Sequence, residues 1–164
     1  MGKRSLVILA FLIAAAIAAG GCENGWAVSK TSIYANPAKI AAAGDSYTFA
    51  DRQGAAEATG GTLSYRGFSG MNTLWRIDHP AEASGKLAVD CKLKTSKGKS
   101  KLVYIAPDGK VQVLAEDNYE GKIDLTVAKG AGRIKLVGQN AKGSLEVRLA
   151  AGDGVTIEAE GNME

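Results

Sequence analysis

Apolar residues in the second half of this chain recur at every second position, in short runs that each follow a glycine. Such runs follow Gly85, Gly109, Gly121, Gly132 and Gly143. The glycines from Gly109 to Gly154 lie 11 or 12 residues apart. A period of two places successive side chains on opposite faces of an extended strand, and turns about every 8–12 residues are typical of all-β sandwiches and barrels. The chain is therefore expected to be all-β.

The turn residues favour antiparallel pairing of these strands. Pro107-Asp108-Gly109 and Asp153-Gly154 are tight-turn sequences. Parallel strands need crossovers of about a dozen residues or more, and the gaps here are too short for them. We predict an antiparallel β-sandwich, jelly-roll-like, with about nine strands. A β-solenoid is the alternative, because short corners connect its coils and the alternation fits both. The strands are expected near Ser46, Gly61, Thr73, Lys86, Lys101, Lys110, Lys122, Arg133 and Ser144.

The alternation also predicts which side chains form the core. The residues expected inside are Val111, Val113, Ile123, Leu125, Ile134, Leu136, Leu145 and Val147. Their neighbours Gln112, Asp124, Lys135 and Glu146 are expected to face solvent.

The beginning of the chain has the pattern of an export signal. Lys3 and Arg4 precede an apolar stretch of about 14 residues, Leu6 to Ala19, which suits a secretory h-region and is short for a membrane span. It ends in Ala19-Gly20-Gly21-Cys22, and this ending resembles the lipobox of a bacterial lipoprotein precursor. The resemblance implies that Cys22 carries a diacylglyceryl thioether, with acyl chains such as palmitate. The alternative is cleavage after Ala16-Ile17-Ala18, which leaves Cys22 as a free thiol.

This reading divides the chain into three parts. Residues 1–21 are a lipoprotein signal peptide, residues 22–45 a tether, and residues 46–164 the β-sandwich domain. Within the tether, Asn36 suits a helix N-cap, Pro37 the first helical position, and Gly44 the position after the end. This short helix is expected either to pack on the domain or to fray, because two turns are not stable alone.

Charge and cysteine content bound the function. The chain has 20 basic and 17 acidic side chains, and 18 basic ones without Lys3 and Arg4. This balance gives no reason to expect a nucleic-acid partner. Cys91 follows the apolar alternation and is expected to be a buried, small hydrophobic residue. His79, the single histidine, precedes Pro80, so no Cys–His dyad is expected.

Three clusters are candidate binding features. The lysines from Lys92 to Lys101 either keep a solvated hairpin from edge pairing or contact anionic envelope polymers or lipid head groups. Tyr104 and Tyr119 are weak candidates for stacking on a sugar ring. Glu116, Asp117 and Glu120 are weak candidates for holding Ca²⁺, although their spacing matches no EF-hand.

Catalytic motifs are missing from the sequence: it has no G-x-S-x-G, H-E-x-x-H or phosphate-binding loop. We therefore expect no enzyme and no cofactor. The mature part resembles small, uncharacterised β-sandwich lipoproteins of bacteria. The segments that carry this resemblance are Gly67-Phe68-Ser69-Gly70, Leu74-Trp75-Arg76-Ile77, Tyr104-Ile105-Ala106-Pro107-Asp108-Gly109 and Arg133-Ile134-Lys135-Leu136-Val137-Gly138.

The function expected from the sequence is that of a non-catalytic domain anchored to the cell membrane and facing outside the cytoplasm. A binding module for a cell-envelope polysaccharide or protein is the first hypothesis. A structural component of the envelope without a small ligand is the second. An accessory domain of a carbohydrate-processing enzyme is the third.

Overall fold

The computed structural model describes residues 30–160, so the export segment and Cys22 lie outside the described residues. The described chain is all-β: an antiparallel sheet of eight strands that does not close, with a short helix on one face. The elements are α2 (Pro37–Ile40), β1 (Ser46–Thr48), β2 (Asp51–Glu57), β3 (Gly60–His79), β4 (Gly85–Ile105), β5 (Val111–Glu116), β6 (Tyr119–Val127), β7 (Gly130–Ala151) and β8 (Thr156–Ala159).

Three of the strands are unusually long. β3, β4 and β7 contain 20, 21 and 22 residues, and each covers two of the shorter strands expected from the sequence. The strand number is therefore eight rather than about nine. Every strand pair is antiparallel, so the pairing does not indicate a solenoid.

The long strands bend where their register shifts. Two of the three shifts between β3 and β7 lie between Tyr65 and Gly70, and the shifts between β4 and β7 lie between Thr95 and Lys99. Gly98 shows why a glycine is needed there: its φ is +70°, and a Cβ would lie 2.3 Å from the carbonyl oxygen of Asn140. We call residues 65–70, 95–100 and 138–143 together the bend. The glycines mark changes of direction within strands as well as turns between them.

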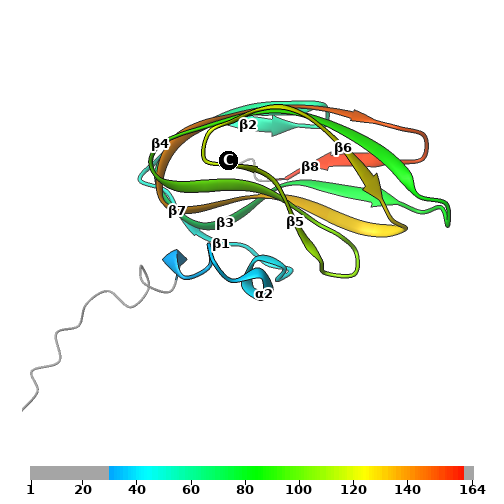
Figure 1. Ribbon diagram of the computed structural model, residues 1–164, viewed down its shortest axis with the longest axis horizontal. Coiled ribbons are helices and arrows are strands. Elements are labelled where there is room, and N and C mark those ends of the chain that lie inside the picture. Colours follow the sequence, from blue (N-terminus) through cyan, green and yellow to red (C-terminus); the bar gives the residue numbers. More distant parts are fainter. Residues whose placement is uncertain (1–29, 161–164) are drawn as a thin grey trace, which may run out of the picture.

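The bend divides the sheet into two arms (Figure 1). In the first arm, residues 60–66, 143–151 and 85–95 of the long strands are flanked by β2 and β6. In the second arm, residues 69–79, 130–138 and 99–105 are flanked by β1, β8 and β5. Figure 1 shows the arm with β2 and β6 above the arm with β1 and β5. The main core, which includes Leu63, Phe68 and Trp75, takes residues from both arms.

The core confirms most of the predicted alternation. Leu125, Ile134, Leu136, Leu145 and Val147 are buried, and Ile123 is partly buried. The prediction for β5 was wrong: Val111 contacts a second apolar cluster, and Val113 is 48% exposed. Because a register shift follows Leu102 in β4, these valines pair with Ile105 and Val103, whose side chains belong to the second cluster on the face away from the main core. In β5 the buried residues are Leu114 and Ala115 instead.

Residues 30–45 cover the outer face of the second arm. Ile33, Tyr34 and Ile40 are buried there against side chains of β3, β4 and β7. The contacted side chains are Met71, Val103, Ile105 and Val137. We call residues 30–45 the N-terminal strap; in Figure 1 it lies, with α2, below the second arm.

The strap corrects the prediction that Lys135 faces solvent. Lys135 lies on the face opposite Ile134 and Leu136, as alternation requires, but its side chain is 0% exposed because the strap covers it. Gln112, Asp124 and Glu146 are exposed as expected.

Candidate functional site

A large surface cleft lies on the first arm, beside the bend. It has a volume of about 710 Å³ and takes residues from β2, β3, β4, β7 and the turn before β6. Basic and hydroxyl side chains dominate its lining. These are Arg66, Lys94 and Lys142 together with Ser64, Thr95, Ser96 and Ser144, and the lining also includes Asp51 and Asn118.

Strand register brings these residues together from distant parts of the chain. Ser144 of β7 lies between Ser64 of β3 and Lys94 of β4, so the three form one row across the sheet. Next to it, Lys142 pairs with Lys97, and Ser96 donates a hydrogen bond to the Lys142 carbonyl at 3.1 Å. Residues opposite one another in an antiparallel sheet point to the same face, so these side chains share one surface.

A buried hydrogen-bond network supports the floor of the cleft. The hydroxyl of Tyr65 lies 2.8 Å from that of Ser100, which also contacts the Thr95 hydroxyl. Thr95 donates to the carbonyl of Asp117 at 2.8 Å, and the Asp117 carboxylate accepts from the amide of Ser100 at 3.2 Å. Burial raises the pKa of Tyr65 above its usual range, so the tyrosine stays protonated. The network fixes the bent part of β4 against the β5–β6 turn.

The charges in the cleft are not neutralised within the described protein. Arg66, Lys94 and Lys142 are exposed, and none of them belongs to an ion pair among residues 30–160. Asp51 lies opposite Arg66 in the register of β2 and β3 and is the acidic residue in the lining. Cationic groups beside several hydroxyl donors suit a ligand that carries phosphate or carboxylate and accepts hydrogen bonds.

The two tyrosines considered for sugar stacking lie away from the centre of this cleft. Tyr104 is 2% exposed in the main core, and its hydroxyl has no hydrogen-bond partner among the described residues. Burial accordingly raises its pKa. Tyr119 packs partly buried on the core and lines a smaller pocket with Lys92 and Glu120. Because Tyr104 is buried, the two tyrosines do not form a shared surface on which a sugar ring could stack.

The three acidic residues considered for calcium point to different partners. Glu116 accepts a hydrogen bond from the Tyr34 hydroxyl at 2.7 Å, and Glu120 forms an ion pair with Lys92 at 2.7 Å. The hydrogen bond from Lys92 lowers the pKa of Glu120. Asp117 binds the backbone of Ser100. Among residues 30–160, no group of three or more metal-ligating side chains comes together.

Cys91 and His79 lie in separate places. Cys91 is a free thiol, 1% exposed in the core, and burial raises its pKa to about 12. His79 lies at the end of β3, where its Nδ1 is 3.0 Å from the Gly154 carbonyl and its Nε2 is 2.6 Å from that of Ala83. These hydrogen bonds raise the pKa of His79.

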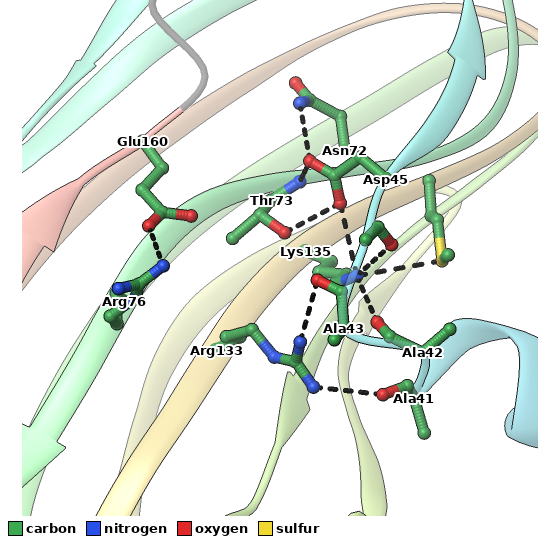
Figure 2. Close-up of polar contacts among 12 residues, drawn as sticks. Ala41, Ala42, Ala43, Asp45, Asn72, Thr73, Arg76, Arg133, Lys135 and Glu160 are labelled. Atoms are coloured by element: carbon green, nitrogen blue, oxygen red, sulfur yellow. Dashed lines mark hydrogen bonds and ion pairs between the residues drawn. The ribbon is translucent and has the colours of Figure 1, made fainter.

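A second polar cluster holds the N-terminal strap on the sheet (Figure 2). The ammonium of Lys135 lies 3.1 Å from the carboxylate of Asp45 and donates to the carbonyls of Ala42 and Gly44 at 2.8 and 3.1 Å. The same carboxylate accepts from the amide and hydroxyl of Thr73 at 2.8 and 2.7 Å. The ammonium of Lys135 thus has three oxygen atoms as partners, as a buried charge requires.

Arg133 extends this cluster along the strap. Its guanidinium donates to the carbonyls of Ala43 and Ala41 at 2.9 and 3.0 Å. Burial alone raises the pKa of Asp45, but the hydrogen bonds from Thr73 and Lys135 outweigh it and hold the pKa below its ordinary value. The cluster holds the strap on the sheet.

Sequence reasoning identified part of the cleft. Lys94 was singled out within the lysine cluster, but Arg66 and Lys142 were not, because they are 28 and 48 residues away along the chain. The signal that brings them together is strand register, which alternation alone does not fix.

Comparison with protein-family models, curated proteins and solved structures found no match. In the described part of the chain, no helix has the length and hydropathy needed to cross a bilayer. The fold and the cleft therefore describe the protein by its structural class and not by a family. It is an all-β protein with an antiparallel sheet folded into two arms and a basic cleft beside the bend.

Proposed function

We propose that this protein is a lipid-anchored, non-catalytic binding module of the bacterial cell envelope. Its ligand is an anionic polymer of the envelope, such as a polysaccharide that carries phosphate or carboxylate. The observation that supports this most is the convergence of Arg66, Lys94 and Lys142, without ion-pair partners among residues 30–160, on a cleft rich in hydroxyl groups.

The anchor in this proposal is Cys22. The lipobox-like sequence Ala19-Gly20-Gly21-Cys22 supports thioether lipidation after export. Two or three acyl chains hold a protein durably in a bilayer, because each buried methylene contributes about 0.8 kcal/mol. Cys22→Ala is expected to leave uncleaved precursor or to release the protein from the membrane fraction. Unchanged membrane association and processing would refute the lipid anchor.

We also propose to class the fold as a sandwich, jelly-roll-like in outline. The two arms enclose a shared core, and the long strands pass from one arm to the other. This supports a sandwich made from one continuous sheet rather than from two separate ones.

Binding in the cleft is tested by removing its charges. The variant Arg66→Ala/Lys94→Ala/Lys142→Ala is compared with Lys110→Ala/Lys122→Ala/Lys129→Ala, which removes the same charge elsewhere. The probe is a soluble acidic polysaccharide, polygalacturonate, with dextran as the neutral reference, and calorimetry measures the affinity. We expect the cleft variant to lose at least about tenfold, because one charge-assisted hydrogen bond is worth about 1.5–3 kcal/mol. Equal losses in both variants would refute a specific site.

A further inference from the structure

The two ends of the folded sheet differ in charge. The three segments of the bend contain Arg66, Lys97, Lys99 and Lys142 and no acidic residue. These four side chains are exposed, and none forms an ion pair among residues 30–160. Acidic groups beside the bend are Asp51, which is opposite Arg66, Glu116, which is opposite Lys101, and Asp117, which binds Ser100.

The opposite end, which carries the β3–β4, β4–β5, β6–β7 and β7–β8 turns, has balanced charge. Lys110 forms an ion pair with Asp108 at 2.7 Å, and Lys129 forms one with Glu82. Asp153 adds a further negative charge in the turn before β8. The unneutralised positive charge is therefore concentrated at the bend.

The strap begins at this same end. Lys30, the first described residue, donates from Nζ to the carbonyl of Tyr47 at 3.0 Å, and Tyr47 pairs with Gly70 of the bend. Tyr34 binds Glu116, which is opposite Lys101, just beyond the bend in β4. Figure 1 agrees, because the blue start of the described chain lies on the side where the long strands bend.

The strap also shortens the connection to the anchor. It already contacts the sheet at Lys30, the first described residue, whereas the sequence alone suggested a tether as far as residue 45. Residues 22–30 span at most about 30 Å when fully extended. An acyl chain on Cys22 therefore keeps Lys30, at the start of the strap, within that distance of the bilayer.

We propose that the bend end docks on the anionic head groups of the membrane that holds the protein. The inference rests on the proposed lipid anchor, and it adds a second, electrostatic contact and a fixed orientation. Basic residues next to a membrane anchor bind acidic lipid surfaces, and this attraction fades within about 8–10 Å at physiological salt. The opposite end of the sheet then points away from the membrane.

The test uses the full lipidated chain in vesicles. An environment-sensitive fluorophore is attached to Gln139→Cys at the bend or to Asp153→Cys at the opposite end, and head-group-labelled lipid quenches it. Cys91 is buried and does not compete for the label. The vesicles contain phosphatidylcholine alone or phosphatidylcholine mixed with phosphatidylglycerol.

We expect strong quenching at Gln139→Cys in the mixed vesicles, reversed by high salt and lost with Lys97→Ser/Lys99→Ser. The matched pair Lys110→Ser/Lys129→Ser should leave it unchanged. Equal quenching at both ends, or no dependence on the acidic lipid, would refute docking while the anchor stands. Loss of polygalacturonate binding with Lys97→Ser/Lys99→Ser, with quenching unchanged, would assign the bend to the polymer instead. Failure of the protein to float with vesicles would overturn the anchor and docking together.

Discussion

The ammonium of Lys135 lies 3.1 Å from the carboxylate of Asp45, and the Lys135 side chain is completely buried. Asp45 ends the N-terminal strap, whereas Lys135 lies in the first half of β7. The contact joins two segments 90 residues apart and makes the strap part of the folded unit. A strap fixed in this way connects the sheet to whatever precedes Lys30 without a long flexible spacer.

The first prediction concerns this ion pair. Asp45→Ala leaves a buried ammonium without its counter-charge, and breaking a buried pair costs about 3–5 kcal/mol. Asp45 is 24% exposed, so we expect a loss near the lower end of that range, measured by urea unfolding. Asp124→Ala, at an exposed position of β6, should stay within about 0.5 kcal/mol. A loss below about 1 kcal/mol for Asp45→Ala would mean that water reaches Lys135.

The second prediction concerns pH and His79. Hydrogen bonds to the carbonyls of Gly154 and Ala83 raise its pKa in the folded protein, because only the protonated ring donates from both nitrogens. Its stabilising contribution is therefore complete below about pH 6.5, the unfolded pKa, and is lost as the pH rises through the folded pKa. The midpoint of urea unfolding should therefore fall as the pH rises from mildly acidic to mildly basic, and His79→Gln should make this fall smaller. An NMR titration of this single histidine that gives a pKa below the ordinary value would contradict the assignment.

The third prediction concerns Cys91. Burial in the core raises the pKa of its thiol to about 12, so the reactive thiolate is scarce at neutral pH. We expect labelling of the Cys91 peptide, followed by mass spectrometry, to be slow in the native protein and fast in urea. Cys91→Ser should cost about 1–3 kcal/mol, because a hydroxyl replaces an apolar thiol in the core. Labelling at equal rates in both conditions would show that the thiol is open to solvent.

The fourth prediction separates the two faces of the sheet. Leu136→Ala removes a side chain that is 1% exposed in the main core and should cost about 2–5 kcal/mol. Val113→Ala removes one that is 48% exposed on β5, and we expect a change within about 0.5 kcal/mol. Both stabilities come from urea unfolding at one pH. Similar costs for the two variants would contradict the outward position of Val113.

Much of the local pattern was predictable from the sequence. Leu145 and Val147 are inside and Glu146 is outside, because successive side chains of a regular strand alternate. Asn36 also caps the short helix as its type suggests, accepting from the amide of Lys39 at 3.1 Å. Such features depend on neighbours along the chain and need no knowledge of the partner strand.

The candidate site was predictable only in part. Lys94 belongs to a visible run of lysines, but its neighbours in the cleft come from other strands. A shift of two residues in the register of β7 would keep Leu145 and Val147 on the core face but would move Ser144 out of the row with Lys94 and Ser64. Alternation does not exclude such a shift, because the choice depends on how the whole sheet packs.

The division between sequence and tertiary structure is clearest at Lys135 and Val113. Alternation by itself determined that Lys135 lies on the face opposite Ile134, and together with the turn residues it indicated the all-β, antiparallel class. Only the tertiary structure decided that this face is covered, because the strap that buries Lys135 comes from 90 residues earlier. Likewise, the register shift after Leu102 decided that Val113 faces outward. The alternation of side chains along a strand decides which residues share one of its faces. Long-range packing decides whether that face contacts the core, the strap or water.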